Sequence, residues 1–213
     1  TTVTFAQKKE KIKGSKIVTT ERREIDNFQE LVIEDNLEVH LERGEKAEVK
    51  IEADENLHQI ISLEQYNKTL RIFTTQLASS YKKMIVRITY TEDLNLISSK
   101  NESSINAIQE LLLNKLTINA FDSSKLFMNA TVKNFVLQAG DKSKMELNIK
   151  SENVTIELNK NASLKALIAT DAIKVDQYQK SNATVEGSAT SAIIRLDNNA
   201  SFTGNKLNTK SAT

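Results

Sequence analysis

From residue 116 the sequence repeats every 19 residues, in units that begin at Leu116, Phe135, Val154, Ile173 and Ala192. Positions 1, 3 and 11 of the aligned units hold only apolar residues. Positions 4, 8 and 10 hold only polar or charged residues. A short repeat with alternating apolar positions and no helical periodicity is typical of stacked solenoid coils.

The repeat therefore predicts an all-β fold, a single-stranded parallel β-helix with coils of about 19 residues. Each coil is expected to lie about 4.8 Å from the next and to pair with it in register. Residues 94–115 fit one longer coil, in which Leu94, Leu96 and Ile105 would face inward. The fifth unit is followed by no polar or helical cap, and an uncovered coil exposes unpaired backbone groups.

Before the repeats, apolar residues alternate over 28–33 and 37–41, which predicts short strands, and further strands are expected over 70–74 and 84–90. Residues 53–65 fit either a helical turn that begins at Asp54 or a strand. No linker rich in Pro, Gly or Ser divides the chain. We expect one β-helical domain over 13–213, in which the strands of 13–92 cap or extend the coils of 93–213, after a flexible segment over 1–12.

Composition narrows the function classes. A net charge of +1 gives no basic excess for a nucleic-acid backbone, so no nucleic-acid partner is expected. The chain has no Cys, and its two His stand in no metal-binding spacing, so we expect no metal and no cofactor. No apolar run is long enough to cross a bilayer, so no membrane span is expected.

Asp122 and Asp141 occupy the same position of consecutive units, which makes them the one stacked acidic pair worth testing. Carboxylates at strand spacing can raise each other's pKa and act in acid–base chemistry. The same column continues with Lys160, Gln179 and Asn198, which is typical of a solvated turn. The turn is the favoured interpretation, and no catalytic residue is predicted.

Few aromatic residues are placed to stack on a sugar. Phe127 is the clearest candidate on an outer face, with Phe121 and Tyr178 as further positions. Ladders of Ser, Thr, Asn and Lys on the same faces suit broad, weak, multivalent contacts.

The first residues contain Thr4-Phe5-Ala6 before Gln7, with small residues where a signal peptidase requires them. The chain would then begin inside the end of a secretory signal. An accidental match in a frayed terminus is the alternative.

The stretch ERREIDNFQELVIEDNLEVHLERG, with Arg23, Phe28, Val32, Val39 and Gly44, and the element Ala53–Leu57 that follows it resemble the family named putative auto-transporter adhesin, head GIN domain. The resemblance covers about 13–213. It implies an exported bacterial envelope protein with a right-handed β-helix, and it favours the signal-peptide interpretation. The turns depart from the family pattern, because Asn-Ala-Ser or Asp-Ser-Ser stands where the family has glycine-rich turns.

The expected function is an adhesin-like binding or scaffold module without catalysis, exported to the periplasm, the outer-membrane surface or the exterior. A surface glycan or a protein is the expected ligand, and a homo-oligomer could form through end coils or lateral faces. Two alternatives stay open. One is a carbohydrate-active enzyme or polysaccharide binder that uses Asp122 and Asp141, and the other is a structural part of a larger envelope assembly.

Overall fold

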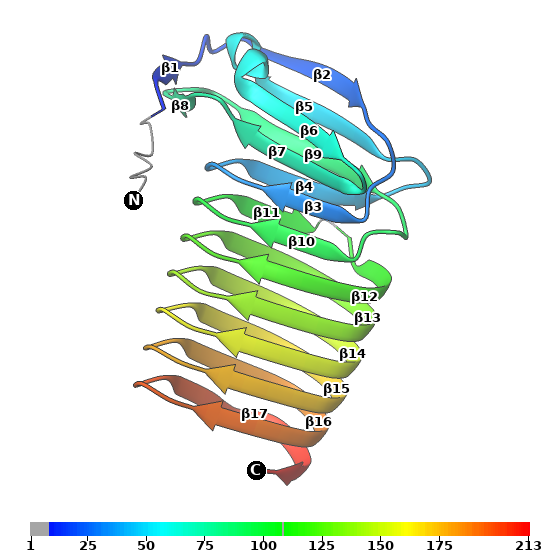
Figure 1. The fold of residues 1–213 in the computed structure, drawn as a ribbon, viewed down its shortest axis with the longest axis vertical. Helices are drawn as coiled ribbons and strands as arrows, with labels where there is room; N and C mark the ends of the chain where they lie inside the picture. Colours follow the sequence, from blue (N-terminus) through cyan, green and yellow to red (C-terminus); the bar gives the residue numbers. More distant parts are fainter. Residues whose placement is uncertain (1–8, 108) are drawn as a thin grey trace, which may run out of the picture.

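The structure is a computed structural model that describes residues 9–107 and 109–213. The chain forms a column of stacked β-coils with additional strands at its N-terminal end (Figure 1). The strand near residue 20 and the last strand lie at opposite ends of this column (Figure 1). The predicted all-β solenoid with coils of about 19 residues is confirmed.

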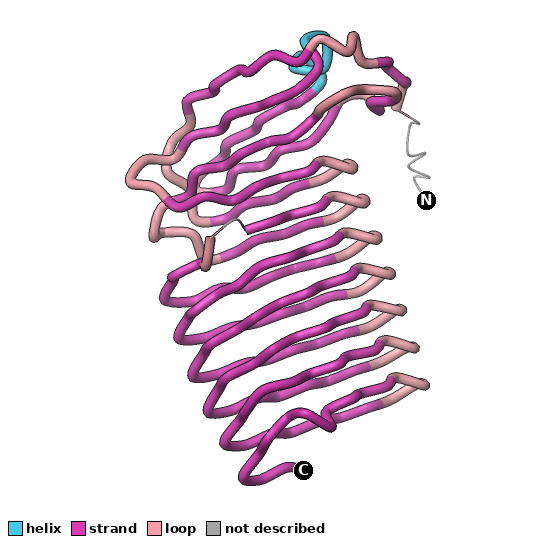
Figure 2. Tube along the Cα trace, turned by 180° about the vertical axis from the view of Figure 1, so that it is seen from behind, coloured by secondary structure: helices cyan, strands magenta, loops and turns pink. Residues whose placement is uncertain are grey.

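Four strands of equal length make the regular part of the column: β13 (Lys125–Ala139), β14 (Lys144–Leu158), β15 (Ser163–Gln177) and β16 (Asn182–Leu196). Shorter strands flank them, β12 (Leu111–Ala120) before and β17 (Ser201–Ala212) after. Neighbours pair in parallel with a shift of one repeat, so that Phe135 is opposite Val154 and Val154 is opposite Ile173. Each long strand bends at its middle and passes from one layer of the column to the other (Figure 2).

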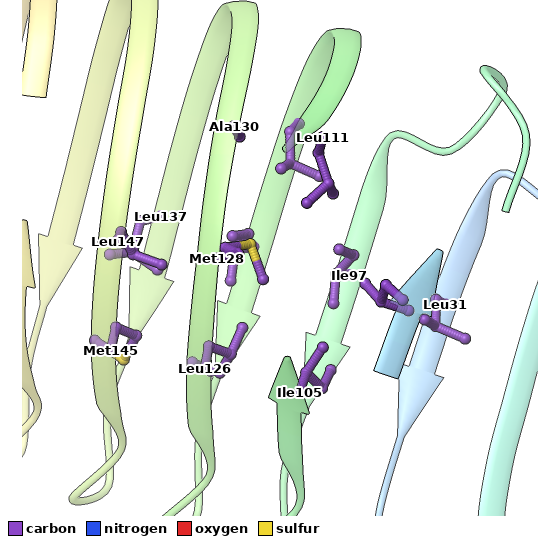
Figure 3. Packing of buried hydrophobic residues seen from close by; sticks show 14 of the residues in the cluster. Leu31, Ile97, Ile105, Leu111, Leu126, Met128, Ala130, Leu137, Met145 and Leu147 are labelled. Atoms are coloured by element: carbon purple, nitrogen blue, oxygen red, sulfur yellow. The ribbon is translucent and has the colours of Figure 1, made fainter. Parts of the chain in front are cut away.

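The apolar columns of the repeat fill the space between the two layers. Of the fifteen residues at positions 1, 3 and 11, thirteen are buried, and the exceptions are Ile194 and Phe202 in the last coil. Figure 3 shows Leu126, Met128, Met145 and Leu147 on neighbouring strands within this core. The alternation of apolar and polar residues along each strand therefore sets which face is buried.

A two-residue turn joins the layers on one side of the column (Figure 2). Both central residues of each turn have positive φ, as at Asp122 (51°) and Ser123 (62°). The N–H after the turn donates to the carbonyl before it, for example from Ser124 to Phe121 at 3.1 Å. These are the features of type I′ turns, which favour Asn, Asp and Gly. Asp122 and Asp141 are therefore explained locally by backbone geometry.

Lys180 is a poor residue for this turn, since its φ is 59° and its side chain offers no local compensation. Lys180→Gly is expected to raise the free energy of unfolding by about 0.5–1 kcal/mol, because glycine reaches positive φ without strain. Thr155→Gly, in the extended β14, is the matched control and is expected to lower it by a similar amount. Denaturant unfolding measures both, and a shift of the two variants in the same direction would contradict the turn assignment.

The strands before the repeats extend the solenoid. They are β3 (Glu30–Ile33), β4 (Glu38–Arg43), β7 (Thr69–Thr74), β9 (Met84–Tyr90), β10 (Leu96–Ser99) and β11 (Ser104–Ala107). The coil of β10 and β11 stacks between β12–β13 and the coil of β3 and β4. The coil of β7 and β9 stacks beyond β3 and β4. At this end of the column, the coils therefore do not stack in the order in which they occur in the sequence.

Antiparallel strands close the N-terminal end of the column. In one layer β5 (Glu48–Asp54) pairs with β9, and β2 (Val18–Glu24) pairs with β5. In the other layer β6 (Ile61–Tyr66) pairs with β7. A short 3₁₀ helix, η1 (Glu55–Ile60), connects the two layers. We call β2, β5, β6 and η1 the cap, which covers the outermost coil.

For residues 53–65 the sequence allows a helical turn or a strand, and the structure contains both. The 3₁₀ helix η1 begins after Asp54, and the strand β6 follows it. Within the longer coil, Leu94 and Ile105 are buried as expected. The inward prediction for Leu96 is wrong. Ile97 is opposite Leu31 and Ile118 in the buried column, so the pleat turns its neighbour Leu96 outward.

The N-terminal segment pairs with a loop strand, since β1 (Lys11–Lys13) lies parallel to β8 (Leu77–Ser79). The flexible segment expected over 1–12 thus overlaps β1 at its last two residues. Thr4-Phe5-Ala6 lies outside the described residues.

Candidate functional site

The coils present two outer faces. We define the first face by the strand segments that follow each turn, 104–107, 125–132, 144–151, 163–170, 182–189 and 201–209. The second face consists of the segments that lead to each turn, 96–99, 115–120, 134–139, 153–158, 172–177 and 191–196. Every second side chain of a segment points outward, so residues from successive coils form columns that run along the solenoid.

A groove of about 510 Å³ lies on the first face and extends from Ala107 at the end of β11 over β13, β14, β15 and β16. Its volume is within the range of small-molecule sites. Two outward columns form it: Phe127, Glu146, Lys165 and Thr184 in one, and Asn129, Asn148, Leu167 and Glu186 in the other. The groove therefore consists of side chains that the fold holds at strand spacing on a rigid sheet.

Two large apolar side chains of the groove are exposed to solvent. Phe127 is 40% exposed and Leu167 is 51% exposed, although the core of the column has ample apolar residues of its own. Phe127 was identified from sequence as an aromatic on an outer face. Leu167 and Asn148 were not predicted from the sequence. The signal that could have identified them is the apolar side chain of Leu167 in a column that otherwise holds two amides and a carboxylate. Single exposed apolar residues are common, but exposed apolar side chains that line one groove are a feature of an interaction surface.

Ion pairs balance the charges of the groove. Lys165 Nζ lies 4.0 Å from Glu146 Oε1, and Lys206 Nζ lies 3.0 Å from Glu186 Oε1. All four side chains are largely exposed, so these pairs contribute little to stability. Lys206 lies outside the lining, which holds two carboxylates and one lysine, so the groove has no excess of cations to attract an anionic ligand.

The acidic pair lies on the ridge of turns, away from the groove. Asp122 and Asp141 are on consecutive turns, and the N–H of Ser123 donates to the carbonyl of Asp141 at 2.9 Å. Asp141 Oδ1 lies 3.3 Å from Lys160 Nζ. The hollow beside them, about 560 Å³, is lined by turn residues alone: Asn101, Glu102, Asp122, Ser123, Asp141, Lys142, Lys160 and Asn161. Their role as a functional pair stays a hypothesis.

The two histidines lie apart from each other and from the groove. His40 Nε2, on β4, lies 2.8 Å from Glu38 Oε1. His58 Nε2, in η1, lies 2.9 Å from Thr19 Oγ1. Over residues 9–107 and 109–213, no three His, Cys, Asp or Glu side chains are grouped as a metal would require.

Two carboxylates, one buried and one partly buried, tie the N-terminal coils together. Glu34 accepts from Arg71 Nη2 at 2.9 Å and lies 2.9 Å from Lys100 Nζ, so it connects three stacked coils. The hydrogen bond from Arg71 holds the pKa of Glu34 below its usual value. Glu52 pairs with Lys83 and accepts from Arg87 Nε at 3.0 Å, and these donors lower its pKa to about 2.

These pKa shifts predict that the N-terminal end loses stability in acid. A carboxyl group whose pKa falls from 4.5 to about 2 on folding stabilises fully above pH 4.5 and loses that contribution as pH falls toward 2. After allowance for solvent screening, the expected loss from Glu52 is roughly 1–2 kcal/mol. Denaturant unfolding across this range measures it. Glu52→Gln should flatten the dependence, and an unchanged slope in this variant would contradict the assignment.

Comparisons with known proteins agree with this architecture. A family model described as putative auto-transporter adhesin, head GIN domain, matches residues 27–167. The structure is similar to that of a putative adhesin from Parabacteroides merdae, with a TM-score of 0.66 and 14% identity over 96% of this chain and 99% of that chain. A putative adhesin from Bacteroides fragilis gives a TM-score of 0.66 and 16% identity over 95% of this chain and 100% of that chain.

A protein described as a putative lipid binding protein, from Parabacteroides distasonis, shares the fold with a TM-score of 0.57 and 12% identity over 96% of this chain and 100% of that chain. The search of curated proteins found no match. In the described part of the chain, no helix has the length and apolar character of a membrane span. The family match covers well over half of the sequence and agrees with the solenoid and its cap: the chain belongs to the putative auto-transporter adhesin, head GIN domain family.

Proposed function

We propose that this protein is a non-catalytic, adhesin-like binding module and that the groove on the first face is its binding site. The observation that carries the proposal is the open groove over five strands, with exposed Phe127 and Leu167 among amide and charged side chains. Exposed apolar groups on a rigid scaffold bind at low entropic cost, because little has to be ordered on association.

The family description and the neighbours described as adhesins support a binding role. The neighbour described as lipid binding makes a lipid a ligand class to test. We further propose that the protein is exported to the bacterial envelope, as the family description and Thr4-Phe5-Ala6 support. Fractionation of cells that express the full-length precursor tests export, and retention in the cytoplasm would contradict it.

The test of the groove is a binding screen over glycans, lipid vesicles and matrix proteins with the folded chain. Phe127→Ala/Leu167→Ala is expected to weaken binding about tenfold or more, since exposed apolar anchors contribute most of the affinity of such sites. Stability should change by less than about 0.5 kcal/mol, because both side chains are exposed.

Two controls separate the groove from the rest of the surface. Ile193→Ala removes an apolar side chain that is 44% exposed on the second face, and Asp122→Ala/Asp141→Ala removes the acidic pair. Both should bind as the wild type does. If the groove variant retains full binding, the groove is not the site. If instead the acidic variant loses binding or a hydrolytic activity, the turn ridge is a functional site.

A role in assembly is the second candidate, and it rests on the last coil. Over residues 9–107 and 109–213, β17 is paired on one side only, with β16, and its side chains Phe202 and Leu207 are partly exposed. Such an edge can pair with a further strand, of this protein or of another molecule. Measurement of the solution mass at high concentration tests this role, and a strict monomer would contradict it.

A further inference from the structure

We propose that the ligand of the first-face groove is a neutral glycan chain that lies along the axis of the solenoid. The inference rests on the proposed binding function and specifies its ligand class. It depends on the direction of the groove, the chemistry of its side chains and its charge.

The direction of the groove selects an elongated, repeating ligand. Its side chains come from β11, β13, β14, β15 and β16 in turn, so an occupant crosses the strands. Successive coils present equivalent outward positions about 4.8 Å apart. One pyranose unit of an extended glycan is close to this length, so each sugar would face one coil.

The side chains of the groove match the two kinds of surface that a sugar presents. Phe127 exposes part of its ring at one end, and an aromatic ring packs well against the C–H face of a pyranose. Asn129 and Asn148 are opposite each other on β13 and β14. An amide both donates and accepts, as a sugar hydroxyl does, so stacked amides can bind hydroxyl groups on successive units.

The charge of the groove favours a neutral ligand. The two ion pairs, Glu146 with Lys165 and Glu186 with Lys206, leave no excess of cations. An acidic polysaccharide, a phosphate or an anionic lipid headgroup would therefore gain little Coulomb energy here.

Two other ligand classes fit less well. An acyl chain needs continuous apolar contact, but Phe127 and Leu167 are separated by the coil that carries Glu146 and Asn148. An extended peptide binds mainly through backbone hydrogen bonds at a sheet edge. Inside the groove β14 and β15 are paired on both sides, so no such edge is available there.

The experiment is a titration of the folded chain with linear neutral oligosaccharides of one to six units, drawn from glucans, mannans, galactans and N-acetylglucosamine polymers. At least one series should bind, with affinity that rises up to about five units, the number of strands that line the groove, and then levels off. Binding should be insensitive to salt. Asn148→Asp, which keeps the size of the side chain but loses its donor, should weaken it about tenfold.

Charged polysaccharides, phosphatidylglycerol vesicles and peptides are titrated in parallel, with Phe127→Ala/Leu167→Ala as the groove control. Failure of every neutral series, or binding that does not depend on chain length or on Asn148, overturns the glycan inference. If an anionic glycan, a vesicle or a peptide binds and the groove control abolishes it, the glycan inference fails but the proposed binding function stands. If no ligand depends on the groove residues, both fail.

Discussion

Replacement of Asp54 with alanine is expected to lower the free energy of unfolding of the N-terminal end by roughly 3–5 kcal/mol, since it removes the buried acceptor of several partly buried backbone N–H groups. Asp54 is fully buried at the end of β5. Its Oδ2 accepts from the N–H of Lys16 at 2.8 Å, and its Oδ1 accepts from Lys83 at 3.0 Å, while Lys82 donates to both oxygens at 3.1 Å. Denaturant unfolding measures the loss.

A carboxylate is required at this position because both of its oxygens accept hydrogen bonds. The donors come from two chain segments, one at Lys16 and one at Lys82 and Lys83. Burial alone would raise the pKa of Asp54, but the backbone N–H groups outweigh burial and hold the pKa below its usual value. Gly14 approaches the same carboxylate closely, and a Cβ at this position would lie 2.2 Å from Asp54 Oδ2. Asp54 thus joins the N-terminal segment and the loop before β9 to the cap.

Asp54→Asn tests whether charge or volume is responsible. The asparagine has the same size, but its NH₂ group would face backbone donors, so a loss of roughly 2–3 kcal/mol is expected. Asp26→Asn, at an exposed position before β3, is the matched control and should change stability by less than about 0.5 kcal/mol. Faster amide exchange should be confined to β1, β2 and the loop before β9. If Asp54→Asn were as stable as the wild type, the role of the charge would be refuted.

The sequence predicts the regular coils well because burial acts on every unit in the same way. Leu137 and Ile156 are opposite each other, and both must be apolar to exclude water from the space between the layers. The turns are less predictable, because Asp122, Lys142 and Gln179 all adopt positive φ although their side chains differ. Hydrogen bonds between successive turns, such as that from Lys142 to Lys160 at 3.0 Å, hold this geometry whatever the side chain.

The N-terminal end could not be derived from periodicity. The coil of β3 and β4 stacks on β10 and β11, which follow it in the sequence only after β5 to β9. No fixed repeat connects these partners, so the alternation of apolar residues predicts the strands but not their neighbours. The error at Leu96 has the same origin, because the pairing of Ile97 with Leu31 sets the pleat there.

The candidate site is harder to predict than the core. Inward columns are constrained by packing, whereas outward columns can hold any polar residue that solvent tolerates. Apolar residues in the outward columns are therefore informative where they line one groove, as Phe127 and Leu167 do. This signal becomes visible only once the register shows which positions of the repeat point outward.

Gly187→Ala is the second substitution with a large expected effect, a loss of roughly 2–4 kcal/mol at the C-terminal end, from backbone strain and overpacking. Gly187 has a φ of 112°, which residues with a Cβ rarely adopt. A Cβ here would lie 2.1 Å from the carbonyl oxygen of Ile168 on β15. Because that atom belongs to the backbone, β16 would have to move away from β15. Denaturant unfolding measures the loss, and amide exchange locates it.

The position of the strain determines which coils respond. In a solenoid each coil contacts only its neighbours, so the variant should speed amide exchange in β16 and β17 and leave β13 unchanged. Gly204→Ala is the matched control on β17, since its Cβ would meet the ring of Phe202 at 2.6 Å, a partly exposed side chain that can rotate. Its cost should stay below about 1 kcal/mol. Equal losses in the two variants would show that the positive φ and the contact with Ile168 do not set the stability of this end.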